Sequence, residues 1–235
     1  MTAMTQSTPR QAARLLLMPL VVLALSAATP AADPAPGDRP LSAAQVALFE
    51  TPHLKAIAQP ETLEYRFERI GIDPFTDSVA VHIDKIHADG TKYVSFDFLS
   101  GEHHVFYPAV DNFSGNPLLM IFLEHDVQEM KTQIGVAAAY FRNRVRDAFV
   151  DRASMADTTI AFGGKTLPAR RITLKPFAED QRFEHLPAVQ GKIYSFVLSD
   201  QVPGQIEALE VEIPADPDSK APAWSEQLTF VGEKP

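Results

Sequence analysis

The sequence predicts an α+β domain: a curved, half-barrel-like antiparallel β-sheet with an N-terminal helix and a helical hairpin inserted mid-chain. Two observations predict this fold class. Polar and apolar residues alternate over 63–107 and again over 158–231, which is typical of half-buried strands. Over 116–155 the apolar spacing changes to three and four, which is typical of helices. Because a sheet with one apolar face needs a covering layer, we expect the helices to cover it.

The first 28 residues predict a secretory signal peptide. Arg10 and Arg14 precede an unbroken apolar run at 15–25, which ends at Ser26-Ala27-Ala28. A basic segment, a short apolar segment and small residues are the three parts of such a leader. The run is shorter than the ~20 apolar residues of a membrane-spanning helix. We expect cleavage after Ala28 or, as a second choice, after Ala32, and a periplasmic protein without a stable membrane anchor.

Composition narrows the class of the exported protein. With the two leader arginines taken from the 21 basic residues, 19 remain against 30 acidic ones, a net charge of −11 that argues against nucleic-acid binding. The chain has no cysteine, which excludes disulfides, thiolate nucleophiles, Cys-ligated zinc and acyl anchoring, and fits a bacterial periplasm. We expect a signal peptide (1–28), a flexible Pro- and Ala-rich linker (29–40) and a single α+β domain (41–235).

The elements up to residue 107 follow from local patterns. Ser42 and Gln45 match a capping box, which predicts a short helix from Ser42 to about Leu54. Strands are then predicted around 63–67, 79–83, 93–98 and 103–107, with a turn at Asp89-Gly90.

The helical hairpin is predicted over 116–155. Asn116-Pro117 is a good helix start, and apolar residues follow on one face until Gly135. A second helix is expected from about Val136 to Met155. Its predicted inward residues are Ala137, Phe141, Val145, Ala148 and Phe149.

The strand pattern then resumes to the end of the chain. Gly163-Gly164 predicts a hairpin turn between strands at 158–162 and 166–174. A second hairpin turns at Val202-Pro203-Gly204. Further strands are expected at 193–198, 206–213 and 227–231, with loops at 176–191 and 215–223.

Motifs for catalysis and metal binding are weak. No strained-serine signature is present, and Ser114 fits a turn before a helix cap. Gly163-Gly164-Lys165-Thr166 lacks the upstream glycine of a phosphate loop. Glu102 with His104 on one strand face, or His125 with Glu129 at i and i+4, could hold a metal, but exposed polar pairs explain them more simply. We therefore expect no cofactor and no metal, and a protein that is not an enzyme.

Two groups of residues suggest ligand binding. Arg142, Arg144, Arg146 and Arg152 make a basic helix on an acidic protein, which could hold an anionic head group or dock a partner, or could be a solvated face. The chain also has 15 phenylalanines, many at apolar positions. They could fill an ordinary core or line a cavity for an apolar ligand.

The order of elements resembles the LolA/LppX/LolB superfamily of periplasmic lipoprotein and lipid carriers. The shared layout is a signal peptide, an N-terminal helix, a long curved antiparallel sheet and helices inserted midway, over most of 42–231. The resemblance implies a half-barrel whose concave face and helical lid hold acyl chains. It contains no diagnostic motif.

The first functional hypothesis is a non-enzymatic periplasmic protein that binds a hydrophobic or amphiphilic ligand, most simply a lipid. The alternatives are an accessory factor that docks an exported enzyme or envelope complex, and a hydrolase without a recognisable motif. The predicted ligand-binding residues are Phe96, Phe98, Phe122, Met130, Phe141, Arg142, Arg144, Val145, Arg146 and Phe196.

Overall fold

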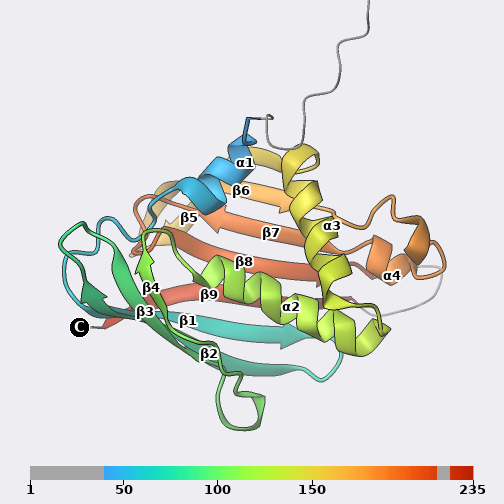
Figure 1. Ribbon diagram of the computed structural model, residues 1–235, viewed down its shortest axis with the longest axis horizontal. Helices are drawn as coiled ribbons and strands as arrows, with labels where there is room; N and C mark the ends of the chain where they lie inside the picture. The colour runs from blue at the N-terminus through green and yellow to red at the C-terminus, as the bar shows by residue number, and fades with distance from the viewer. Residues whose placement is uncertain (1–39, 216–222, 235) are drawn as a thin grey trace, which may run out of the picture. The chain divides into compact units, whose positions relative to one another are not determined.

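The computed structural model describes residues 40–215 and 223–234, which form one nine-stranded antiparallel sheet with helices on one face (Figure 1). The predicted α+β fold class is confirmed. The signal peptide, the linker up to residue 39 and most of the predicted loop at 215–223 lie outside the described residues. The strands are β1 (Glu61–Ile70), β2 (Phe75–Ile86), β3 (Lys92–Phe98), β4 (Val110–Phe113), β5 (Ser154–Phe162), β6 (Lys165–Leu174), β7 (Ile193–Leu198), β8 (Ile206–Ile213) and β9 (Trp224–Lys234).

The sheet consists of two meanders. They are joined where β1, the first strand along the chain, pairs with β9, the last. The strand order is β4-β3-β2-β1-β9-β8-β7-β6-β5, so each meander runs through sequence neighbours and β9 returns to pair with β1. That central pair joins Phe67 to Leu228 and Tyr65 to Phe230, and all four side chains are buried. The helical hairpin connects the two meanders along the chain.

The first two helical segments begin where the sequence predicts, and α2 also ends there, whereas the first segment ends at Glu50, before the predicted Leu54. In α1 (Ala43–Gln45), which continues as the π-helix η1 (Val46–Glu50), the Ser42 and Gln45 side chains form the full capping box. Helix α2 (Leu118–Ile134) starts after Asn116, whose side chain accepts a hydrogen bond from the Leu118 backbone N–H. It ends at Gly135, whose φ of 76° suits glycine at a left-handed helix terminus.

The hydrophobic core lies between the sheet and the helical pair of α2 and α3 (Ala138–Asp151), which crosses in front of the sheet in Figure 1. Alternating strand residues such as Leu63, Val81 and Phe196 are buried on this face. Phe141 of α3 stacks on Phe183, which lies in the segment containing η3 (Gln181–Phe183) and α4 (Pro187–Gln190). This segment closes the core beside α3. No helix in the described part of the chain is long and apolar enough to cross a membrane.

The predicted strand at 103–107 is wrong. Leu99 and Gly101 adopt positive φ angles of 62° and 53°, which turn the chain out of the sheet after β3. A short 3₁₀ helix, η2 (Gly101–His103), follows, and only Val105 forms a bridge, back to Phe98. The edge strand comes later, at β4.

The second helix is shorter than predicted. It starts at Ala138, so Ala137 is exposed and not an inward residue. It ends at Asp151, because Arg152 leaves helical geometry with a φ of −122°. Met155 therefore belongs to β5. On α2, His125 is buried beneath the helix, although the helical spacing places it on the polar face.

Candidate functional site

An apolar groove lies between α2, α3 and the N-terminal helical segment, which consists of α1 and η1. Its volume is about 260 Å³, somewhat below the ~300–1,000 Å³ of pockets that hold drug-sized ligands. The groove therefore has room for one apolar chain or ring rather than for several acyl chains. The lining residues are Gln45, Phe49, Met120, Leu123, Glu124, Val127, Arg142, Val145, Arg146 and Phe149.

Helical periodicity places these side chains along the groove. On α2, Met120, Leu123 and Val127 recur at spacings of three and four, so they form one stripe. On α3, Val145 and Phe149 repeat the spacing opposite them.

The N-terminal helical segment forms the third wall of the groove. The Phe49 ring meets the Phe149 ring edge to face, with their centroids 5.1 Å apart. The Ser42 hydroxyl donates to the Phe149 carbonyl oxygen at 2.7 Å, which fixes the start of the segment against the end of α3. Phe49 and Met120 keep exposed fractions of 39% and 58%, so the apolar walls reach solvent.

The groove has a charged rim. Arg142 donates two hydrogen bonds to the Glu124 carboxylate, at 2.7 and 2.6 Å, and this pairing lowers the pKa of Glu124. Arg146 donates to the Asn143 side chain at 3.0 Å and lies 3.9 Å from the Asp147 carboxylate, with 72% of its side chain exposed. Arg146 is therefore the rim cation whose guanidinium has donors left for a ligand.

The structure distributes the ten predicted ligand-binding residues over several places. Arg142, Val145 and Arg146 line the groove. Arg144 instead pairs with the buried Asp180 at 3.0 Å, where Asp180 also accepts from the Tyr140 hydroxyl. Phe96 is half-buried against the core. The remaining predicted residues are buried in the core and do not line the groove: Phe98, Phe122, Met130, Phe141 and Phe196.

Phe49 and Met120 line the groove but are not among the residues predicted from the sequence. Met120 lies outside the apolar stripe that faces the sheet, because α2 has a second apolar stripe toward α3. Both residues are large and apolar yet exposed, which is the signal of a binding surface, but exposure is not readable from the sequence.

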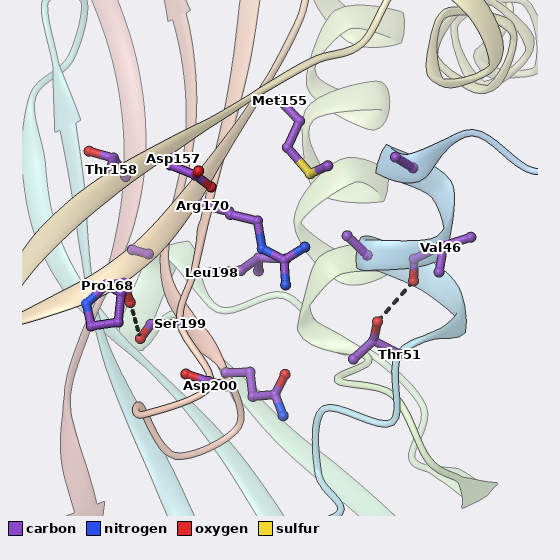
Figure 2. Close-up of a pocket in the computed structure, with 14 residues that line it drawn as sticks. Val46, Thr51, Met155, Asp157, Thr158, Pro168, Arg170, Leu198, Ser199 and Asp200 are labelled. Atoms are coloured by element: carbon purple, nitrogen blue, oxygen red, sulfur yellow. Dashed lines mark hydrogen bonds between the residues drawn. The ribbon is translucent and has the colours of Figure 1, made fainter.

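A larger pocket of about 830 Å³ lies on the other side of the N-terminal helical segment (Figure 2). It is bounded by Val46 and Thr51 of that segment, by β5 and β6, and by the turn after β7. Arg170 points into it from β6 (Figure 2) and forms no ion pair within the described residues. Polar and apolar groups alternate around this pocket, so it lacks the continuous apolar wall of the groove.

Beneath α2 lies a buried charged cluster. Arg69 of β1 donates through Nε to Glu226 of β9 at 2.6 Å, and it lies 3.5 Å from Glu129 of α2. Glu226 is fully buried, and burial raises its pKa to about 7 despite the Arg69 guanidinium. His125 faces the second Glu226 oxygen at 3.7 Å, and burial lowers the pKa of His125.

A second buried cluster joins α2 to β7. Asp126 of α2 forms an ion pair with Lys192 and accepts a hydrogen bond from the Tyr194 hydroxyl at 2.5 Å. All three residues are buried, and the adjacent carboxylate together with burial raises the pKa of Tyr194. The three groups satisfy one another, which indicates a structural role for this cluster rather than ligand binding.

The two pairs considered as metal ligands lie in different surroundings in the structure. Glu102 and His104 do not share a strand face, because η2 replaces the predicted strand. His125 and Glu129 face Glu226 and Arg69, respectively. Within residues 40–215 and 223–234 no group of three or more potential metal ligands comes together.

Thr62, His82 and Asp97 place a hydroxyl, an imidazole and a carboxylate in a row, as in the catalytic residues of some hydrolases. The His82 Nδ1 and the Thr62 hydroxyl are 3.0 Å apart, and the His82 Nε2 lies 3.0 Å from an Asp97 carboxylate oxygen. These residues lie on β1, β2 and β3, at positions that alternate with buried residues such as Val81, so they face away from the helices. They line neither the groove nor the larger pocket. Backbone N–H groups there pair within the sheet, so no oxyanion site adjoins Thr62.

Of the comparisons with known proteins, only the one with solved structures finds a match. No family model matches the sequence, and no curated protein matches it. Among solved structures, the chain is similar to the lipoprotein LppX of Mycobacterium tuberculosis, with 12% sequence identity and a TM-score of 0.32. The match covers 78% of this chain and 91% of that chain.

Proposed function

We propose that this protein binds a hydrophobic or amphiphilic ligand, most simply a lipid, with an apolar chain in the groove between the N-terminal helical segment, α2 and α3. The observation that carries the proposal is the groove itself: a pocket with mainly apolar walls that opens to solvent. Each CH₂ group buried there contributes about 0.8 kcal/mol. Arg146 at the rim supplies a cation for an anionic head group. The protein acts in this proposal as a periplasmic binder or carrier and not as an enzyme.

Export is part of the proposal. The leader with Arg10, Arg14 and the apolar run at 15–25 supports secretion, and the absence of cysteine suits a periplasmic protein. Amino-terminal sequencing of protein recovered from the periplasm tests it, with Thr29 or Asp33 expected as the first residue. A full-length chain retained in the cytoplasm would contradict it.

Ligand binding is tested first by native mass spectrometry of the mature protein, purified from its own periplasm without detergent. A lipid-sized adduct in stoichiometric amount is expected, and organic extraction identifies its class. For the apo protein, titration with lauric acid against bound anilinonaphthalene sulfonate measures affinity directly. If lauric acid neither binds nor displaces the dye, and no adduct is found, the proposal is wrong.

The position of the ligand is tested with a matched pair of methionines. Met120 lines the groove and Met155 lines the larger pocket, and both are exposed. Met120→Glu places a carboxylate in the path of the apolar chain, so we expect about tenfold weaker lauric acid binding. Met155→Glu should leave the affinity unchanged. The reverse result would assign the ligand to the larger pocket.

The head-group contact is tested in the same way. Arg146→Glu should weaken binding of lauric acid but not of the uncharged dodecanol, because only the anion uses the guanidinium. Arg170→Glu, in the larger pocket, is the control and should affect neither ligand.

The two alternative functions have less support. Docking through the basic helix is disfavoured because Arg142 and Arg144 already pair with Glu124 and Asp180 inside the domain. Hydrolysis is disfavoured because the Thr62–His82–Asp97 arrangement has neither a substrate pocket nor an oxyanion site.

A further inference from the structure

The two edges of the sheet differ in length and regularity. β4, at one edge, has four residues, and its register with β3 shifts between its two paired positions. Asn112 within it has a φ of 54°. β5, at the other edge, has nine residues, and all nine pair with β6 in unbroken register. Proteins usually protect such a long edge with lysine, proline or a bulge, because its unpaired backbone groups recruit other strands.

β5 carries none of these protections. Its sequence has no lysine or proline, and its single charge is Asp157. In the part of the chain that the structure describes, β6 is the only strand that pairs with it. Six of its nine residues are exposed: Ser154, Met155, Ala156, Asp157, Thr159 and Ala161.

We propose that β5 pairs antiparallel with β5 of a second copy of this chain, about a two-fold axis at Thr158. Thr158 is the middle residue of the strand, so this register pairs all nine residues. An isologous pair of this kind closes after two copies and leaves no further β5 edge. The inference is independent of the apolar groove.

The side chains of β5 complement one another in this register. Thr158 lies opposite Thr158 of the second copy, a favourable cross-strand pair. Met155 lies opposite Ala161, and Ala156 opposite Ile160, so apolar residues meet. Asp157 lies opposite Thr159, and the two carboxylates stay apart. An axis one residue earlier would place the two Asp157 side chains against each other.

Because Thr158 lies opposite its own copy in this register, a charge introduced at this one position tests the pairing. Thr158→Lys and Thr158→Glu each place like charges opposite each other, so each should weaken the dimer about tenfold. An equimolar mixture of the two variants should restore association, because lysine then meets glutamate. Sedimentation equilibrium over a concentration series measures the dimer dissociation constant for each sample. Thr76→Lys, on an exposed site of β2 away from this edge, is the matched control and should change nothing.

A second variant changes affinity in the opposite direction. Thr159→Lys places a cation opposite Asp157 of the second copy, twice per dimer, and should tighten the dimer about threefold. This gain cannot come from a folding defect, and circular dichroism checks the fold of every variant. The proposal is overturned if the wild-type protein is monomeric at all concentrations. It is also overturned if the lysine–glutamate mixture fails to associate or if Thr159→Lys weakens the dimer.

Discussion

Helix α2 has two faces that contradict the usual division between a polar outside and an apolar inside. Toward the sheet, beside apolar residues such as Phe122, it presents His125, Asp126 and Glu129, which meet ionisable partners in the interior. Toward α3 and solvent it presents Met120 and Leu123, which line the apolar groove. The first face fixes the position of the helix through buried ion pairs, and the second leaves apolar surface for a ligand.

On this helix, the polarity of a residue does not tell whether it is buried. Buried ion pairs contribute little net stability compared with apolar packing, but removing one partner is costly. They therefore specify one placement of α2 on the sheet. The exposed apolar stripe adds little to the stability of the fold, so we interpret it as a ligand-binding surface.

The largest expected effect comes from breaking the Asp126 cluster. Asp126→Ala leaves the buried Lys192 ammonium without its counter-ion, so the free energy of unfolding should fall by about 3–5 kcal/mol. Urea denaturation measures it. The double variant Asp126→Leu with Lys192→Met is the control and should recover most of the loss. A loss of under about 1 kcal/mol for the single variant would show that the pair does not fix α2.

A smaller effect concerns the pH dependence caused by Glu226. Its pKa in the folded protein, about 7, lies above the usual value of 4.5, so the folded state binds this proton more tightly than the unfolded state. The resulting stabilisation is complete below pH 4.5 and is lost as the pH rises through 7. Between pH 6.5 and 8 the wild type should lose roughly 1 kcal/mol relative to Glu226→Gln.

His53 and His125 act in the opposite direction, at lower pH. Burial lowers both pKa values below 6.5, so these residues destabilise the folded state as the pH falls below that value. The comparison with Glu226→Gln is therefore made above pH 6.5, by urea denaturation at each pH. Identical slopes for the two proteins would contradict a titrating Glu226.

The smallest expected effect is on the rim of the groove. Arg142→Ala removes the ion pair with Glu124, but the Arg142 side chain is 48% exposed and water screens the interaction. The free energy of unfolding should therefore fall by less than about 1 kcal/mol. Thermal unfolding measures it beside Asp126→Ala. A loss as large as that of Asp126→Ala would remove the contrast between the two faces of α2.

Local chemistry made much of the fold predictable from the sequence. The Ser42–Gln45 capping box, the Asn116 cap and the helix end at Gly135 each depend on residues within a few positions of one another. Alternation likewise predicted most of the strands, because side chains on a strand point to opposite faces in turn. The predicted strand at 103–107 is wrong because the chain turns just before it, at Leu99. A leucine rarely adopts the positive φ found there, so the sequence does not indicate the turn.

The order of the elements, the helix caps and the fold class therefore follow from the amino-acid sequence. Which faces are buried depends on partners far along the chain and is seen only in the folded protein. His125 lies in the interior opposite Glu226, about a hundred residues away in sequence, and Phe49 packs against Phe149 to form one wall of the groove. Periodicity defines a face of a helix, but the element that packs against that face determines whether it meets charge, ligand or water.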